Sequence, residues 1–160
     1  MRPLTSQQLL DSFVNADARE LELVELPHDF PILEWDHLDF LAWRDPRTSS
    51  RGYLVVERDG APSGIVLRAA SSTSGARHGI CDICRTMQPG TQVTMFTARK
   101  AGAAGERGDS IGTYMCADLS CHENVRLAAP LAPGEFRANV DARIDGAAQR
   151  MRRFAARVTA

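Results

Sequence analysis

The sequence predicts an α+β fold that combines antiparallel β-hairpins with N-terminal helices and one long C-terminal helix. Three observations support this fold class. Two apolar runs flank an Asp-Gly turn at residues 59–60, two close pairs of cysteines bracket a second strand-turn-strand pattern, and a helical apolar stripe runs through residues 133–158. With 160 residues and 44% hydrophobic content, the chain is long enough for a single domain with an adequate core.

Residues 1–46 are expected to form an acidic, largely helical segment. Thr5 or Ser6 can cap a first helix, and a second helical stretch ends before Pro27. The apolar residues on one side of these helices are Leu9, Leu10, Phe13, Val14, Leu21, Val24 and Leu26. The expected core residues of the next stretch are Phe30, Ile32, Trp35, Leu38 and Phe40. Residues 41–43 are predicted to form a short strand that ends at Asp45-Pro46.

Residues 47–75 are predicted to contain a β-hairpin. Its strands are Tyr53–Glu57 and Ser63–Arg68, and Asp59-Gly60 lies in the turn. Asp-Gly suits the positive φ angles of a tight hairpin turn, and aliphatic residues of the kind that strands favour flank it.

The whole cysteine complement of the chain falls in two close pairs, Cys81/Cys84 and Cys116/Cys121. Zinc is usually held by four sulfur or nitrogen ligands in a tetrahedron, and a Cys-x-x-Cys turn brings two sulfurs to one ion. The pattern therefore predicts one zinc ion with these four cysteines as ligands. Because four thiolates leave no position for water or substrate, we expect this zinc to be structural.

Disulfides and redox chemistry are the alternatives to a metal site. The first residues of the chain contain no apolar signal segment, which predicts a cytoplasmic protein whose thiols stay reduced. A redox Cys-x-x-Cys motif needs a strand before it and a helix that begins at its first cysteine. Residues 71–75 instead have the composition of a loop, and Pro89-Gly90 prevents a long helix. Zinc explains the cysteines better.

The segment that contains the cysteines, residues 76–130, predicts a treble-clef zinc finger. Residues 92–98 and 110–115 have strand character, and the glycines and alanines of residues 101–108 suggest a flexible turn between them. Asp118 or Ser120 can cap a helix that runs through Val125 and Leu127 until Pro130, which places Cys121 in its first turn. A knuckle, a hairpin and a helix with a ligand in its first turn are the parts of a treble clef.

Residues 131–160 are predicted to contain the long C-terminal helix, from about Pro133 to Val158. Its apolar stripe consists of Phe136, Val140, Ile144, Ala147, Met151 and Ala155, which suggests packing on the core. The arginines on its other faces are Arg143, Arg150, Arg152, Arg153 and Arg157.

The formal net charge of −1 hides an asymmetry. Residues 1–46 carry 3 basic and 10 acidic side chains, whereas residues 47–160 carry 16 and 10. The acidic segment could pack against the basic remainder, or the basic part could face an acidic partner, such as RNA or a protein bound to RNA.

The sequence gives little sign of an enzyme or of a membrane protein. Asp36, His37 and Asp39 could serve acid-base chemistry, but no orienting partner or phosphate-binding loop accompanies them. His78 and His122 flank the cysteine pairs and could replace a ligand or bond to a sulfur, although solvated roles suit both better. No stretch is long and apolar enough to span a membrane. No small-molecule substrate is expected.

Several stretches of this sequence resemble a known family. Residues 79–84 and 93–98, followed by residues 111–121 with their Gly-Thr-Tyr approach to the third cysteine, are similar to the C-terminal treble-clef zinc-finger domain of FBP or FusB-type proteins, which bind elongation factor G. The upstream residues 43–46 and the hairpin at residues 52–68 look similar too.

The resemblance implies a non-enzymatic, zinc-containing binder of elongation factor G, a translational GTPase. In fusidic-acid-resistance members of the family, the zinc-containing domain contacts the factor and helps it to leave the ribosome. Those members also have an N-terminal helical bundle, which we expect to be absent or much reduced here, since about 45 residues precede the predicted sheet. By position, the resemblance implies partner contacts at Phe96, Arg107, Tyr114, Arg153 and Phe154.

A zinc-dependent module that binds RNA or another nucleic acid is the competing interpretation of the basic residues. Such binding would weaken steeply with added salt, and single strands would need aromatic side chains for stacking. The aromatic content of 6% and the nearly neutral chain favour a protein partner, while direct contact with RNA stays open.

Overall fold

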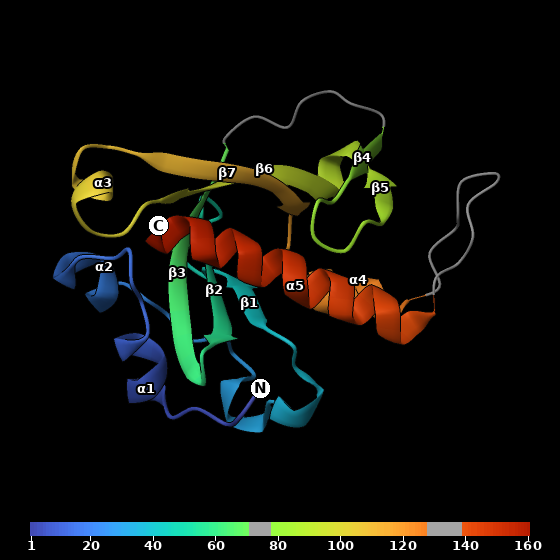
Figure 1. Cartoon of the computed structure of the whole chain (residues 1–160), viewed down its shortest axis with the longest axis horizontal. Coiled ribbons are helices and arrows are strands. Elements are labelled where there is room, and N and C mark those ends of the chain that lie inside the picture. Colours follow the sequence, from blue (N-terminus) through green and yellow to red (C-terminus); the bar gives the residue numbers. More distant parts are fainter. Residues whose placement is uncertain (71–77, 128–138) are drawn as a thin grey trace.

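The computed structural model describes residues 1–70, 78–127 and 139–160 (Figure 1). Its centre is the predicted hairpin, in which β2 (Arg51–Arg58) pairs with β3 (Ala61–Ala69). Asp59 and Gly60 both have positive φ angles, 51° and 76°, so the Asp-Gly turn has the backbone conformation expected of it. The α+β fold class is confirmed, with helices around antiparallel strands.

Three more strands complete a five-stranded antiparallel sheet. They are β1 (Leu41–Arg44), β6 (Val93–Arg99) and β7 (Ser110–Cys116), and the strand order is β1-β2-β3-β6-β7. Strands β6 and β7 pair along their whole length, but β3 meets β6 at only two positions, Arg68 with Thr97 and Ala69 with Phe96. The two hairpins therefore diverge from a short shared seam, as Figure 1 shows.

The carboxamide of Asn15 links the diverging hairpins beside this seam. Its Oδ1 accepts from the N–H of Val66 at 2.8 Å, and its Nδ2 donates to the carbonyls of Val66 and Arg99 at 3.1 and 2.9 Å. Just before it, Phe13 forms a parallel bridge with Gly64 on the open edge of β3. The N-terminal segment thus supplies hydrogen bonds that a neighbouring strand would otherwise make.

Strands β2 and β3 are buried on both faces, between two hydrophobic clusters. Leu54, Val56, Ile65 and Leu67 belong to the cluster that contains the cysteines and helix α5 (Val140–Thr159). The alternating residues Tyr53, Val55 and Val66 belong to the cluster formed with the N-terminal segment. Because successive strand residues point to opposite faces, a continuous apolar run fits a strand covered on both sides.

Both predicted N-terminal helices are present but end earlier than expected, since Phe13 and Val14 lie beyond the first and Val24 and Leu26 lie beyond the second. Helix α1 (Ser6–Asp11) has a capping box made by Thr5 and Gln8, and α2 (Ala18–Glu22) has one made by Asp17 and Glu20. Phe13 is buried beyond the end of α1, whereas Val14 is exposed. The two 3₁₀ turns are Phe30–Ile32 and Trp35–His37. Phe40 is a core residue as expected, but the prediction for Ile32 is wrong, since it is 79% exposed.

The predicted flexible turn between β6 and β7 contains a short helix instead, α3 (Gly102–Glu106). Ala103 and Ala104 favour helix strongly enough to offset their glycine neighbours. A Cβ on Gly105 would lie 1.8 Å from the carbonyl oxygen of Lys100, so this close turn requires glycine. The carbonyl of Val158 in α5 accepts a hydrogen bond from Ala101 N–H, which fixes this end of the hairpin to α5.

Helix α5 crosses the sheet (Figure 1) and is capped by Asn139. Ala147, Met151 and Ala155 are buried as predicted, and Ala148, Phe154 and Val158 join them. Val140 is 42% exposed, so the expectation that it belongs to the core stripe is wrong. The predicted start near Pro133 and the stripe residue Phe136 lie outside the described residues. No helix among those described combines the length and apolarity needed to cross a bilayer.

Ion pairs join the acidic N-terminal segment to the basic remainder. Glu20 accepts from both Arg68 and Arg99, at 2.6 and 2.9 Å, and Asp39 accepts from Arg126 at 2.6 Å. Two further pairs of this kind are Arg47 with Glu25 and Arg51 with Asp45. The intramolecular explanation of the charge asymmetry therefore holds for these arginines.

Candidate metal centre

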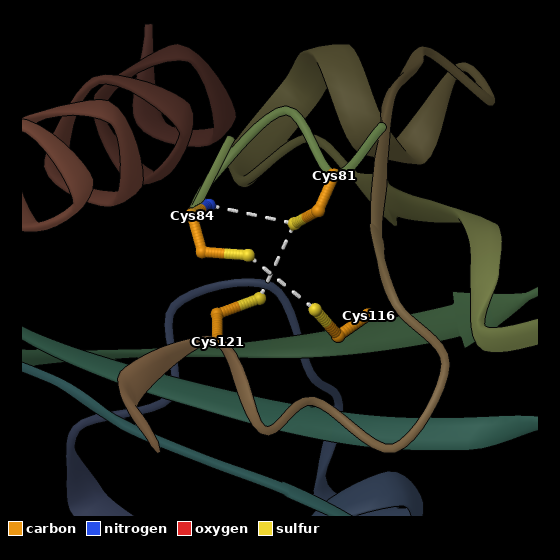
Figure 2. A group of neighbouring side chains, drawn as sticks. All are labelled: Cys81, Cys84, Cys116 and Cys121. Atoms are coloured by element: carbon orange, nitrogen blue, oxygen red, sulfur yellow. Dashed lines mark hydrogen bonds between the residues drawn. The ribbon is translucent and has the colours of Figure 1, made fainter. Parts of the chain in front are cut away.

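Two parts of the chain that are distant in sequence bring the four cysteines together. Strands β4 (His78–Ile80) and β5 (Met87–Pro89) form a small hairpin, which we call the knuckle, and Cys81 and Cys84 lie in its turn. Cys116 is the last residue of β7, and Cys121 is the first residue of helix α4 (Cys121–Arg126). Figure 2 shows the four side chains pointing toward one common centre.

The distances between the four sulfurs fit one tetrahedral zinc ion. All four Sγ atoms lie within 4.8 Å of one another. The Sγ atoms of Cys81 and Cys121 are 3.5 Å apart, and those of Cys84 and Cys116 are 3.6 Å apart. Zn–S bonds of about 2.3 Å in a tetrahedron place neighbouring sulfurs roughly 3.8 Å apart. All four thiols are free, and a disulfide would bring two sulfurs to about 2.05 Å.

Hydrogen-bond donors surround the sulfurs and favour their charged form. The backbone N–H groups of Ile83 and Cys84 point at the sulfur of Cys81, at 3.4 and 3.5 Å. The carboxamides of Asn124 and Gln88 donate to Cys116 Sγ at 3.4 and 3.7 Å. The Thr86 hydroxyl lies 2.9 Å from Cys84 Sγ. Such donors orient metal ligands and reduce the charge on each sulfur.

The thiols are buried, and each sulfur affects the ionisation of the others. Hydrogen bonding with Cys116 lowers the pKa of the Cys84 thiol, whereas the pKa of Cys121 lies well above its ordinary value because of hydrogen bonds with Cys116 and the other sulfurs. Four sulfurs this close ionise together only when a cation shares their charge. A dication with four thiolate ligands meets that requirement.

The knuckle is held in place from two sides. On one side, Asp82 N–H donates to the carbonyl of Tyr114 at 2.8 Å, and Asp82 Oδ2 accepts from Tyr114 N–H and Thr113 Oγ1, each at 3.0 Å. On the other side, Arg150 of α5 donates its Nε–H to the carbonyl of Ile83 at 2.7 Å. These contacts fix the first cysteine pair relative to the second.

Of the two histidines near the cysteines, His122 does not replace a ligand. His122 Nε2 lies 2.7 Å from the carbonyl oxygen of His37, and its ring packs edge-on against Phe40. The side chain of His78 lies outside the described residues. The cluster of Asp36, His37 and Asp39 does not converge either, because His37 pairs with Glu34 and Asp39 with Arg126.

The residues expected to contact a partner are not on one surface. Phe96 and Phe154 are 0% and 4% exposed, so their rings belong to the core and the candidate contact surface excludes them. Tyr114 is 48% exposed beside the knuckle. Arg107 is exposed but lies at the far end of the β6–β7 hairpin, after α3, and Arg153 is exposed on α5.

Sequence reasoning missed several residues that support the centre. Thr86, Gln88 and Asn124 contact the sulfurs, and Arg150, which was expected only on a helix face away from the apolar stripe, holds the knuckle. The only available signal was that the first two follow Cys84 closely and Asn124 lies one helical turn after Cys121. The exposed apolar residues Ile80 and Met87 on the knuckle were missed too.

The comparisons with known proteins agree with this geometry. A family model for the FBP C-terminal treble-clef zinc-finger matches residues 8–158. Among solved structures, the chain is similar to the fusidic acid resistance protein FusC, with a TM-score of 0.55 and 21% sequence identity over 78% of this chain and 52% of that one. The chain thus spans about half the length of FusC, and at this identity the likeness concerns the fold alone. A search of curated proteins found no match.

Proposed function

Because the chain belongs to the FBP C-terminal treble-clef zinc-finger family, we propose that it is a non-enzymatic zinc protein that binds the translational GTPase elongation factor G. The four-cysteine centre carries this proposal. Family membership and the four close cysteines support zinc binding. We further propose a single structural ion, because four sulfur ligands fill a tetrahedral coordination sphere.

The surface that we propose for the partner lies on the knuckle. Ile80 and Met87 are opposite one another in the β4–β5 pair, so their side chains share a face, and they are 58% and 47% exposed. Asp82 joins this turn to the backbone of Tyr114. We call Ile80, Met87 and Tyr114 the knuckle patch. Exposed aromatic and apolar side chains on a rigid support are typical of the centre of a protein interface.

Binding to purified elongation factor G tests this function. In a pull-down at moderate salt, the wild-type chain should retain the factor, and Tyr114→Ala or Ile80→Ser/Met87→Ser should lose most of the binding. The matched control is Ile32→Ser/Leu23→Ser, which removes two exposed apolar residues, 79% and 47% exposed, from the N-terminal segment. Binding that is absent for the wild type, or equal for both double variants, would contradict the proposal.

Release of the factor from the ribosome is the finer part of the proposal. FusC is described as a fusidic acid resistance protein, and the fold it shares with this chain supports a related role. An in vitro translation reaction stalled by fusidic acid should recover when the chain is added, and recovery should fail with Tyr114→Ala. If the factor binds but translation stays stalled, the chain binds elongation factor G without releasing it.

A further inference from the structure

The acidic N-terminal segment neutralises arginines selectively. It pairs with Arg51, Arg68, Arg99 and Arg126 on the sheet and α4. On α5 and the knuckle, six arginines have no acidic side chain of the described residues within 4.0 Å, and one of them, Arg152, lies off the helix face that the other four on α5 share. The remaining five, which we call the arginine stripe, are Arg85, Arg143, Arg150, Arg153 and Arg157.

Four of the five arginines follow one side of α5. Residues spaced by three and four positions lie above one another on a helix, as positions 143, 146, 150, 153 and 157 do. Position 146 is a glycine, and a Cβ there would lie 2.9 Å from Arg150 Nη1, so the glycine leaves room for that guanidinium. The stripe extends about 21 Å along the helix axis.

Arg85 adds a fifth positive charge from the knuckle. Arg150 bonds to the carbonyl of Ile83, two residues before Arg85, so the knuckle and the middle of the stripe are in contact. None of these guanidinium groups has a carboxylate of the described residues within 4.0 Å, and the nearest acidic side chains to Arg153 line the same pocket as it does, at Asp36, Asp39, Glu57 and Asp59.

The backbone of Arg85 is also strained. Its φ angle is 59°, a left-handed conformation that glycine adopts at little cost and that other residues seldom adopt. Arg85 is exposed, and its own side chain is not a metal ligand. An arginine at a position that suits glycine, beside other arginines, costs stability in two ways, and such costs concentrate at binding sites.

We propose that the arginine stripe binds the phosphate backbone of RNA. Guanidinium groups match the geometry of phosphate and form two parallel hydrogen bonds with it. The exposed side chains of the stripe are charged and none is aromatic, whereas a protein partner would need an apolar centre such as the knuckle patch provides. Nucleic-acid interfaces are more polar and more positive. This inference goes beyond binding of elongation factor G and does not depend on it.

Fluorescence anisotropy with a labelled RNA hairpin, in the absence of elongation factor G, tests the proposal. The affinity should fall steeply between low and moderate salt. Arg153→Gln/Arg157→Gln should weaken binding and reduce the slope of log K against log salt concentration by about 1 for each arginine. The control Arg19→Gln/Arg107→Gln makes the same charge change at two exposed sites away from the stripe and should bind RNA like the wild type.

Arg85→Gly separates a role in binding from a role in folding. The change should leave the thermal unfolding midpoint unchanged or raise it by up to about 2 to 4 °C, because the left-handed strain is relieved. RNA binding should nevertheless weaken, and Arg85→Lys should restore part of it.

A polyglutamate peptide serves as a carboxylate probe. RNA binding that is absent, equal in both double variants, or no stronger than polyglutamate binding would overturn the proposal.

Discussion

Tyr53 donates a hydrogen bond of 2.6 Å from its phenol to Asp45 Oδ2 in the cluster between the sheet and the N-terminal segment. Tyr53 is 0% exposed, and the Asp45 side chain is 1% exposed. Asp45 also accepts from the N–H groups of Arg47 and Thr48 and lies 3.7 Å from Arg51. One carboxylate therefore organises the turn between β1 and β2.

This pair should make stability depend on pH at both ends of the scale. Burial raises the pKa of Tyr53 to about 12, with the hydrogen bond to Asp45 contributing, so its stabilisation is complete below about pH 10 and is lost as the pH rises toward 12. Burial opposes ionisation of Asp45, but hydrogen bonds from Tyr53 and the backbone outweigh it and the pKa is lowered. The stabilisation from Asp45 is therefore present above about pH 4 and is lost as the pH falls.

Urea unfolding across the pH range measures these losses. Tyr53→Phe should lower the free energy of unfolding near neutral pH by about 1 to 3 kcal/mol, because Asp45 loses a buried donor, and should flatten the decline above pH 10. In a Tyr114→Phe background, Tyr53 is the sole tyrosine, so tyrosinate absorbance reports on it alone. A Tyr53 titration near pH 10 in the folded protein would contradict the prediction.

Removal of the metal should unfold the knuckle. Freshly purified, reduced protein should contain one zinc per chain. Chelation or Cys84→Ser should unfold residues 78–127 and so reduce the circular dichroism signal of the chain, since metal binding and folding are coupled in such sites. Elemental analysis and circular dichroism measure the two effects. Protein without zinc that melts cooperatively at the same temperature would refute this prediction.

The donors to Cys116 should set zinc affinity without being ligands. Asn124→Leu removes the 3.4 Å contact to Cys116 Sγ and should lower zinc affinity by about 10- to 100-fold. Competition with a chromophoric chelator measures the affinity. Asn139→Leu, at the cap of α5, is the control and should leave the affinity unchanged. Equal affinities for the two variants would show that Asn124 has no such role.

The three hydrogen bonds of the Asn15 side chain should contribute strongly to the free energy of unfolding. Asn15→Ala leaves two carbonyls and one N–H without a partner and should cost at least about 2 kcal/mol in the free energy of unfolding. The exposed Gln7→Ala should change it by less than about 0.5 kcal/mol. Denaturant unfolding compares them, and similar values for both would exclude the bridging role of Asn15.

Local chemistry made part of this structure predictable. The Asp59-Gly60 turn, a helix cap at Thr5 or Ser6 and the close spacing within each cysteine pair all depend on neighbours in sequence. The structure has the turn at Asp59-Gly60, the cap at Thr5 and the four sulfurs together. The buried positions of Phe96 and Phe154 depend on which faces pack together, and a list of aromatic residues does not contain that information. The contact of Arg150 with Ile83 joins residues that are 67 positions apart, which no periodicity reveals.

Because the seam between β3 and β6 is short, the N-terminal residues up to Asn15 also help to hold the two hairpins together. Since the two hairpins share only two paired positions, the hydrogen bonds of Asn15 to Val66 and Arg99 add a second polar link between them, beside the core that they share. Removing the first 15 residues would thus remove the hydrogen bonds that link the two hairpins beside the seam. The amide of Val66, which donates to Asn15, should then exchange its hydrogen faster than the amides in the middle of either hairpin.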